Sequence, residues 1–442
     1  MSAARSAVQK FFHSLNNERR TWLCAAPRAI TLLVLSLLTA CTTPRPQAPL
    51  ERVHVSADGR GFVMQSSGRA FTPWGFNYDH DETGRLLEDY WDAEWPKVEE
   101  DFREMKELGA NVVRVHLQFG KFMRSETEPN TQALARFTQL LRLAERTRLY
   151  LDVTGLGCYH KQDVPAWYDA LDEERRWAAQ ANFWRAVARA GRGSHAVFCY
   201  DLMNEPVAPH SNGVGKDWLG PPLGGKHFVQ WISREGRGRE RHAMARAWIQ
   251  QLVRAIRAED SAALVTVGVV DWSLPRPGLD SAYHPAVVAP ELDFLSVHLY
   301  PERGKVGDSL DTLRAFQVGK PVVIEETFPL KCSAAEFDDF FRRAQPHAAG
   351  WMGFYWGRTP DECRRSHELT DAFMLGWLEW FQKQSGEGTE AGQPSPSPEG
   401  DGAMGSRSVS RDYARSKRSR FITLFHAAMK SWTNCFSESA QP

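Results

Sequence analysis

Residues 320–326 read Lys-Pro-Val-Val-Ile-Glu-Glu, a run of β-branched residues that ends abruptly in two acids. β-Branched residues favour strands, and an apolar run without alternation is typical of a strand that is buried on both faces. Burying charge is costly, so the two glutamates indicate the end of such a strand. The segment is therefore predicted to be a strand of a parallel sheet with acidic groups at its carboxyl end.

The same pattern recurs along the chain, and helix-like stretches such as 131–147 and 243–258 lie between the repeats. The eight predicted strands are residues 71–77, 111–117, 149–154, 197–203, 264–270, 294–299, 321–326 and 350–356. Eight strand and helix units predict an α/β fold, a single closed (β/α)8 TIM barrel, with an opening hairpin at 53–65. An open doubly wound sheet is the alternative, and it is disfavoured because no glycine-rich dinucleotide loop follows the first strand.

The two ends of the chain differ from this middle region. Residues 1–41 are predicted to be an export signal, because arginines precede a short apolar stretch that ends in Leu38-Thr39-Ala40-Cys41. This tetrapeptide is similar to a bacterial lipobox, so we expect lipid attachment at Cys41 and an exported, membrane-anchored lipoprotein of the cell envelope. An ordinary signal peptide with a chance cysteine is the alternative. Residues 42–52 are interpreted as a tether, 53–384 as the barrel domain and 385–442 as a disordered Ser/Pro/Gly-rich and basic tail.

Composition argues against several classes of protein. The 442 residues include 54 basic and 54 acidic side chains, and this formal net charge of zero does not favour nucleic acid as a partner. The seven cysteines lack a metal-ligand spacing. Cys332 and Cys363 could form a bridge in an oxidising compartment, although sequence does not fix the pairing. We expect a monomer that needs no metal and no organic cofactor.

In a barrel of this kind the chemistry lies at the carboxyl ends of the strands. Hydrolysis of a glycoside needs a carboxylic acid to protonate the leaving oxygen and a second carboxylate on the other face of the sugar. Glu205 after the fourth strand and Glu326 after the seventh are predicted to be this acid/base and this nucleophile. Because side chains alternate along a strand, Glu325 is predicted to point away from the cleft, toward the surrounding helices.

Other polar or aromatic groups at the strand ends are predicted to support this pair. A cation or a hydrogen-bond donor beside the nucleophile would keep it ionised, an amide could bind a sugar 2-hydroxyl, and an indole offers a flat face to a sugar ring. In these roles we place Arg114 and Tyr300, Asn204, and Trp356, in that order. His298 is predicted to contact the sugar or Glu205, and further substrate contacts are expected from Asn77, His116 and Trp272.

Residues 71–380 resemble glycoside hydrolase family 5, the cellulase-like barrels of clan A. The resemblance rests on Gly109-Ala110-Asn111-Val112-Val113-Arg114, Asn204-Glu205-Pro206, His298-Leu299-Tyr300, residues 320–326 and Trp356. It implies a retaining hydrolase of a β-glucan, a β-mannan or a related oligosaccharide, acting through a glycosyl-enzyme intermediate. Two positions depart from the family pattern: His160 lies past the end of the third strand, and Phe328 stands where glycine is common.

Two other classes of function are alternatives to the enzyme. A catalytically inactive carbohydrate-binding lipoprotein on the same barrel would have no need of Glu205 or Glu326, and a tethering envelope protein would leave the polar strand ends unexplained. The long segment 207–240 predicts a lid or an insertion, and Asp79 and His80 could line one end of the cleft. The sequence leaves open whether the enzyme cuts within chains or at their ends.

Overall fold

The computed structural model describes residues 48–81, 83–210, 213 and 215–390. Cys41 with the rest of the predicted signal segment, and residues 391–442 of the predicted tail, lie outside the described residues. The chain divides at Pro49, and the features below belong to the unit that begins at Leu50. None of the helices within the described ranges is long and apolar enough to cross a membrane.

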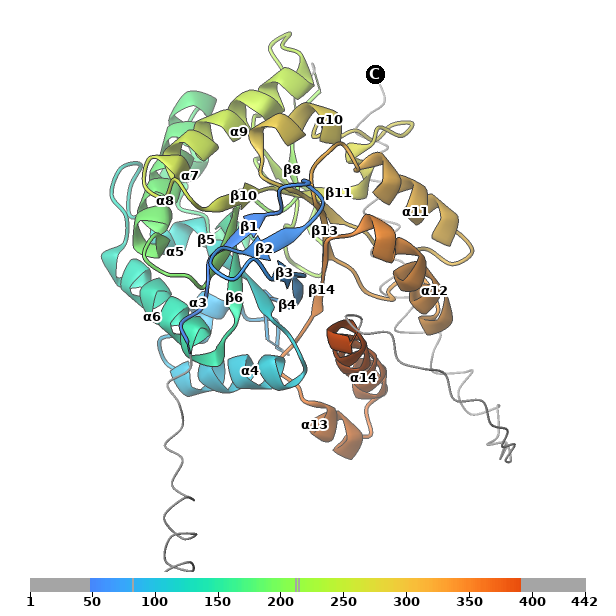
Figure 1. Cartoon of the computed structure of the whole chain (residues 1–442). Coiled ribbons are helices and arrows are strands. Elements are labelled where there is room, and N and C mark those ends of the chain that lie inside the picture. Colours follow the sequence, from blue (N-terminus) through green and yellow to red (C-terminus); the bar gives the residue numbers. More distant parts are fainter. Residues whose placement is uncertain (1–47, 82, 211–212, 214, 391–442) are drawn as a thin grey trace, which may run out of the picture. The chain divides into compact units, whose positions relative to one another are not determined.

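A ring of parallel strands forms the centre of this unit, with helices around its outside (Figure 1). The strands follow one another in the order of the chain, and all eight predicted segments contribute, which confirms the barrel. They are β4 (Trp74–Tyr78), β5 (Val112–Gln118), β6 (Tyr150–Gly157), β7 (Val197–Asp201), β10 (Leu264–Thr266), β11 (Gly268–Val270), β12 (Leu295–His298), β13 (Val322–Glu326) and β14 (Gly350–Phe354).

The fifth predicted strand is broken into two short strands, which lie at the two edges of the sheet and complete the ring. β10 pairs with β7 on one side, whereas β11 pairs with β12 on the other, and only Val267 separates them. The prediction of one unbroken strand at 264–270 is wrong in this respect. Gly268 follows the break, and a Cβ there would lie 2.4 Å from Glu325 Oε2, so the absence of a side chain lets the backbone approach the charged groups inside the barrel.

The helices bury one apolar face each against the strands. α6, for example, begins after Asn130, whose side chain accepts from the Gln132 N–H, and it buries Phe137 and Leu140. The longer helices are α4 (Trp95–Glu107), α6 (Thr131–Thr147), α8 (Glu173–Gly191), α9 (Arg241–Arg257), α11 (Val306–Ala315), α12 (Ala334–Ala344) and α14 (Leu369–Glu390), and the shorter ones are α3 (Leu87–Tyr90), α5 (Phe119–Phe122), α7 (Ala166–Asp169), α10 (Pro285–Val288) and α13 (Pro360–Arg365).

The last helix is longer than predicted. α14 continues to Glu390, so residues 385–390, which composition assigned to a disordered tail, are helical. Extending a helix that is already formed adds one hydrogen bond for each residue that is fixed, and this favours propagation even into a glycine-containing stretch.

A small antiparallel sheet precedes the barrel. The predicted hairpin is present as β1 (Val53–Val55) and β2 (Phe62–Met64), but a third strand, β3 (Ala70–Phe71), joins it. The predicted first barrel strand at 71–77 is therefore two strands. Phe62 of this sheet packs edge-on against Phe198 and Phe294 with ring centroids 5.2 Å apart, at the amino ends of β7 and β12.

The cysteines of the described part of the chain are free thiols. Cys332 and Cys363, for which a bridge was considered, are not joined.

Candidate active site

Arg114 lies at the centre of the barrel interior and is fully buried. Its Nη1 donates to Glu326 Oε1 at 2.6 Å and to Asn77 Oδ1 at 3.0 Å. Its Nη2 donates to Asp201 Oδ2 at 2.8 Å and to Asn204 Oδ1 at 3.0 Å. One guanidinium from β5 therefore links β4, β13 and the end of β7, and it fixes the nucleophile candidate in place.

Glu326 is held by a second donor as well. The Tyr300 hydroxyl donates to Glu326 Oε2 at 2.8 Å. Burial, followed by the charge of Glu326, raises the pKa of Tyr300 well above its usual value, so the phenol keeps the proton that it donates. With Arg114 on one oxygen and Tyr300 on the other, the carboxylate has a fixed orientation at the end of β13.

Glu205 follows β7 in a strained backbone conformation, with a φ of 48°. The left-handed region is unfavourable for a side chain with a Cβ, and non-glycine residues in it cluster at functional sites. The Glu205 N–H donates to the Gly268 carbonyl at 2.9 Å, which anchors this turn to β11. Burial raises the pKa of the Glu205 carboxyl, although its hydrogen bond with His298 opposes the shift.

His298 lies between the acids. Its Nδ1 is 2.9 Å from Glu205 Oε1 and 3.5 Å from Glu326 Oε2, and its Nε2 is 3.3 Å from Glu325 Oε2. Burial opposes a charge on the ring, but Glu326 and the hydrogen bonds to Glu205 and Glu325 raise the pKa of His298 to about 10. The ring is therefore an imidazolium at neutral pH, and it donates from both nitrogens.

The prediction for Glu325 is wrong, because its side chain lies inside the barrel. It is fully buried, and its Oε2 is 3.5 Å from Arg114 Nη2. Burial would raise the pKa of Glu325, but Arg114 and then His298 lower it to about 2. The two glutamates can share one side of β13 because Glu326 is its last residue and the pairing with β12 shifts between Val297 and His298.

Asp152 adds a further carboxyl to the buried group that contains Asp201 and Glu325. Burial, and then the charge of Glu325, raises the pKa of Asp152 well above its usual value. Asp152 is therefore a neutral acid next to an ionised one. The interior of the barrel is charged, and Arg114 and His298 balance its carboxylates.

The remaining predicted residues differ in how closely they approach the pair. Asn77 donates from its amide nitrogen to the carbonyls of Glu325 and Gly353, both at 2.9 Å, so its side chain links Arg114 to β13 and β14. Asn204 donates to the Phe228 carbonyl at 3.1 Å. Its predicted contact with a sugar 2-hydroxyl stays a prediction.

The aromatic candidates also separate into two groups. Trp356 is partly exposed beyond β14, stacked on Phe354 at 5.6 Å, with Phe328 edge-on at 5.3 Å. Phe328 thus occupies its unusual position by packing against the indole. Trp272 instead packs in a small apolar cluster with Val207, Val229 and Val270.

Sequence reasoning missed Tyr159 and the buried acids. After β6 the site receives Tyr159, whose hydroxyl bonds to His116 Nδ1, and His160 is not part of this contact. The departure from the family pattern at His160, the next residue, is the sequence signal that points to this position. Asp152 and Asp201 lie within strands that were predicted correctly, but nothing in the pattern distinguished the barrel interior from the helix-facing side.

In two clusters of side chains, oxygen or nitrogen atoms that could bind a metal lie within 4.8 Å of one another. They are Glu205 with His298 and Glu326, and Asp152 with Asp201 and Glu325. In both groups a protein cation already lies among the carboxylates, His298 in the first and Arg114 in the second. The donor sets therefore do not require a metal for charge balance.

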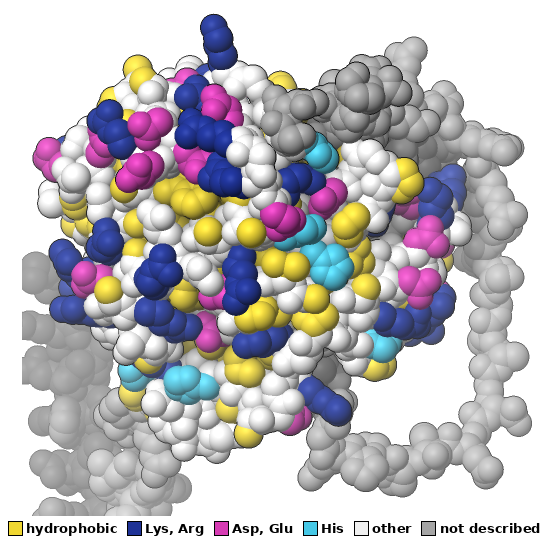
Figure 2. All heavy atoms as spheres, turned by 90° about the horizontal axis from the view of Figure 1, so that it is seen from above, with side chains coloured by type: hydrophobic (Ala, Val, Ile, Leu, Met, Phe, Trp, Pro, Cys, Tyr) yellow, Lys and Arg dark blue, Asp and Glu magenta, His cyan; other side chains and the backbone are white. Residues whose placement is uncertain are grey.

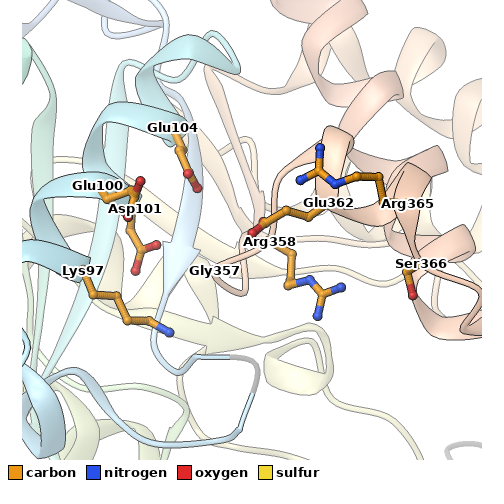
Figure 3. Close-up of a pocket in the computed structure, with 9 residues that line it drawn as sticks. All are labelled: Lys97, Glu100, Asp101, Glu104, Gly357, Arg358, Glu362, Arg365 and Ser366. Atoms are coloured by element: carbon orange, nitrogen blue, oxygen red, sulfur yellow. The ribbon is translucent and has the colours of Figure 1, made fainter.

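A cavity of about 710 Å³ lies away from these residues, between α4 and α13 (Figure 3). Lys97, Glu100 and Glu104 face Arg358 and Arg365 across it. None of the predicted site residues lines it, so we place the chemistry at the barrel mouth on the geometry of the glutamates.

On the side of α9 and α10, basic and acidic side chains are interspersed over the surface (Figure 2).

Comparison with known proteins identifies a family for the chain. The family model described as Cellulase (glycosyl hydrolase family 5) matches residues 66–353. No curated protein matches the chain.

Solved structures with a similar fold include two enzymes named for the cleavage of mannose-containing sugars and one protein in complex with such a sugar. An exo-beta-1,4-mannosidase from Opitutaceae bacterium strain TAV5 is 17% identical with a TM-score of 0.55, and the match covers 76% of this chain but only 62% of that one. A GH5_18 protein from Streptomyces cattleya in complex with Manb1-4GlcNAc is 15% identical with a TM-score of 0.54, covering 74% and 83%. An endo-1,4-beta-mannanase from Rhizomucor miehei is 17% identical with a TM-score of 0.51, covering 75% and 99%.

Proposed function

Because this chain belongs to glycosyl hydrolase family 5, we propose that it is a retaining β-glycosidase in which Glu205 is the acid/base and Glu326 the nucleophile. The setting of Glu326 carries the proposal. Its carboxylate is fixed by Arg114 and Tyr300, and one of its oxygens lies within 4.8 Å of an oxygen of Glu205. Retaining enzymes hold their two carboxyl groups about 5 Å apart, which leaves no room for a water to attack directly.

In the first step Glu326 attacks the anomeric carbon, and the bond to the leaving oxygen breaks. Glu205 gives its proton to that oxygen, which departs as a hydroxyl group with the electron pair of the broken bond. The raised pKa of Glu205 keeps the proton available. Since the imidazolium of His298 is bound to Glu205 Oε1, the proton is carried by Oε2.

In the second step Glu205 is ionised and acts as a base. It takes a proton from a water molecule, the water oxygen bonds to the anomeric carbon, and Glu326 leaves as a carboxylate. Arg114 and Tyr300 stabilise the carboxylate as it departs. Two displacements on opposite faces of the sugar retain the anomeric configuration.

We propose β-mannosides as the first substrates to test, ahead of β-glucans. Support comes from the structures of similar fold, which include a mannosidase, a mannanase and a complex with Manb1-4GlcNAc. The first of these names an exo-acting enzyme and the third an endo-acting one, so the names leave the mode of cleavage open.

The test is a screen of β-mannans, β-glucans and aryl β-glycosides with detection of new reducing ends, followed by proton NMR of the first sugar released. We expect turnover and a product that is initially the β-anomer. An initial α-anomer would contradict the roles of both glutamates. Saturable binding of an oligosaccharide without any turnover would favour a carbohydrate-binding protein on the same barrel.

We also propose that the enzyme is anchored in the cell envelope through a lipid on Cys41. The support is the sequence Leu38-Thr39-Ala40-Cys41 after a short apolar stretch. In cells expressing the full chain, Cys41→Ser is expected to abolish incorporation of labelled palmitate and to move the protein from the membrane fraction to the soluble fraction. Equal membrane retention of both forms would exclude this anchor.

A further inference from the structure

Asp79 is a buried acid beside the catalytic pair that the proposed reaction does not use. It follows β4 and is 7% exposed. Its Oδ2 lies 2.8 Å from His80 Nδ1. Among the described residues, Asp79 Oδ1 and His116 Nε2 are both buried without a hydrogen-bond partner. A buried polar atom without a partner costs free energy, so two on neighbouring strands at the barrel mouth indicate a polar ligand.

The charges of the two groups define what they can bind. Burial opposes ionisation of Asp79, but its contact with His80, and then the charge of Lys226, lower its pKa, so Asp79 is a carboxylate. Burial, and then the charge of Arg114, lowers the pKa of His116 well below its usual value, so its ring is neutral. The free oxygen of the carboxylate can accept a hydrogen bond from a hydroxyl group, and the free nitrogen of the neutral imidazole can donate or accept another, which suits a sugar.

Asp79 lies on the nucleophile's side of the site. In the order of the strands around the ring, β4, which Asp79 follows, lies two strands from β13, which ends in Glu326, and three strands from β7, which Glu205 follows. The sugar that carries the reacting carbon lies against the nucleophile, whereas the leaving group lies against the acid. Asp79 is therefore placed to contact the sugar on the non-reducing side of the cleaved bond.

The long connection after β7 covers this end of the mouth. Residues 218–231, which we call the cover, extend over the end of β6, where the His227 N–H donates to the Tyr159 carbonyl at 2.8 Å. Phe228 of the cover packs on the Tyr159 ring at 5.8 Å. Lys226 then reaches the loop after β4, because a Cβ on Gly84 would lie 3.5 Å from its Nζ.

The cover is anchored at both ends. Trp218 is 1% exposed, its Nε1 donates to the Asp169 carbonyl at 3.1 Å, and Arg176 lies over its ring at 4.2 Å. At the other end β9 (Gln230–Trp231) pairs with β8 (Pro206–Val207). The side chains of Glu205 and Glu326 retain only 10% and 13% exposure.

We propose that Asp79, with His116 and Lys226, binds the hydroxyl groups of a terminal sugar and that the cover blocks any sugar beyond it, so that the enzyme releases single sugars from non-reducing ends. This inference rests on the proposed function. The carboxylate selects the hydroxyl groups of a chain end, and an internal sugar would carry a glycosidic bond where the cover lies.

The first experiment uses β-1,4-mannopentaose and cellopentaose labelled at the reducing end with 2-aminobenzamide. The expected first products of the wild type are the free monosaccharide and the labelled tetrasaccharide. A labelled mono-, di- or trisaccharide as the first product would overturn terminal cleavage while leaving the glycosidase assignment intact. Absence of hydrolysis of every β-glycoside in the screen would instead defeat the proposed function, and this inference with it.

The second experiment assigns the hydroxyl contact to Asp79. It compares 4-nitrophenyl β-mannoside with analogues in which the 3-, 4- or 6-hydroxyl is replaced by hydrogen. For the wild type, kcat/KM is expected to be roughly 10- to 100-fold lower on one analogue than on the parent substrate. This factor is typical of the loss of a hydrogen bond to a charged group. In Asp79→Asn, kcat/KM for the parent substrate should fall by about the same factor. For the sensitive analogue, the substitution should lower kcat/KM little further, because the hydroxyl that Asp79 binds is already missing.

Asp92→Asn is the matched control, because its side chain is 75% exposed and pairs with Arg136 at 2.8 Å on the surface. It is expected to keep the wild-type rates on all four substrates. If Asp79→Asn lowered kcat/KM by one common factor for the parent and for all three analogues, Asp79 would have a structural role, and the proposed contact would be wrong.

Discussion

Replacing Glu326 by Ala is expected to lower kcat by about 10⁴-fold or more on every substrate, because no glycosyl-enzyme bond can form without the carboxylate. Added azide should restore cleavage of an activated aryl glycoside, since it fits the space that the side chain leaves and attacks the same carbon. The product should be a glycosyl azide of inverted configuration, and NMR of that product checks the prediction.

Glu325→Ala is the matched control, one residue earlier on the same strand. Its carboxylate lies inside the barrel beside Arg114 and His298. Removing it leaves buried positive charge with less compensation, so we expect a loss of about 3–5 kcal/mol in the free energy of unfolding. Azide should not restore activity. Rescue at Glu325 and none at Glu326 would mean that the nucleophile has been assigned to the wrong acid.

The second large effect is expected for Glu205→Ala, and it should depend on the leaving group. An alkoxide leaves poorly without a proton, so loss of the acid should lower kcat/KM by about 10²- to 10⁴-fold on oligosaccharides. A dinitrophenolate needs little protonation, so the first step on the dinitrophenyl glycoside should lose far less. The measurement is the ratio of the two losses, and a ratio near one would remove Glu205 from the role of acid.

The pH profile gives an independent check on the same residue. The first step needs Glu205 protonated, and burial raises its pKa. The wild-type rate should therefore fall as pH rises through that raised pKa. In Glu205→Ala this alkaline limb should disappear from the profile on the dinitrophenyl glycoside.

The barrel and most of its site could be predicted because strand ends carry a clear signal. Runs such as 320–326 combine continuous apolar character with abrupt charge, and eight of them leave few alternatives to a closed ring. Arg114, Glu205, His298, Tyr300 and Glu326 accordingly come together in the structure as a contacting group. Their positions follow from topology, which the repeat pattern specifies.

The sequence does not predict which strand side chains face the barrel axis and which face the surrounding helices. A strand of a parallel barrel is buried on both faces, so alternation does not separate residues that face the axis from residues that face the helices. For this reason Glu325 was assigned to the outside, and Asp152 was not noticed. The bend at Glu205 and the break at Val267 depend on contacts between distant strands, and local propensity does not encode them.

The break beside Gly268 has a consequence for how the enzyme loses activity. The same peptide region that joins the two edges of the sheet also accepts the hydrogen bond of the Glu205 N–H, and the Gly268 N–H donates to Asp201 at 2.8 Å. The backbone at the junction of β10 and β11 is therefore hydrogen-bonded directly to Glu205, the proposed acid. Local opening of this junction, without unfolding of the whole domain, would displace Glu205. The enzyme would then lose activity at a lower free-energy cost than that of global unfolding.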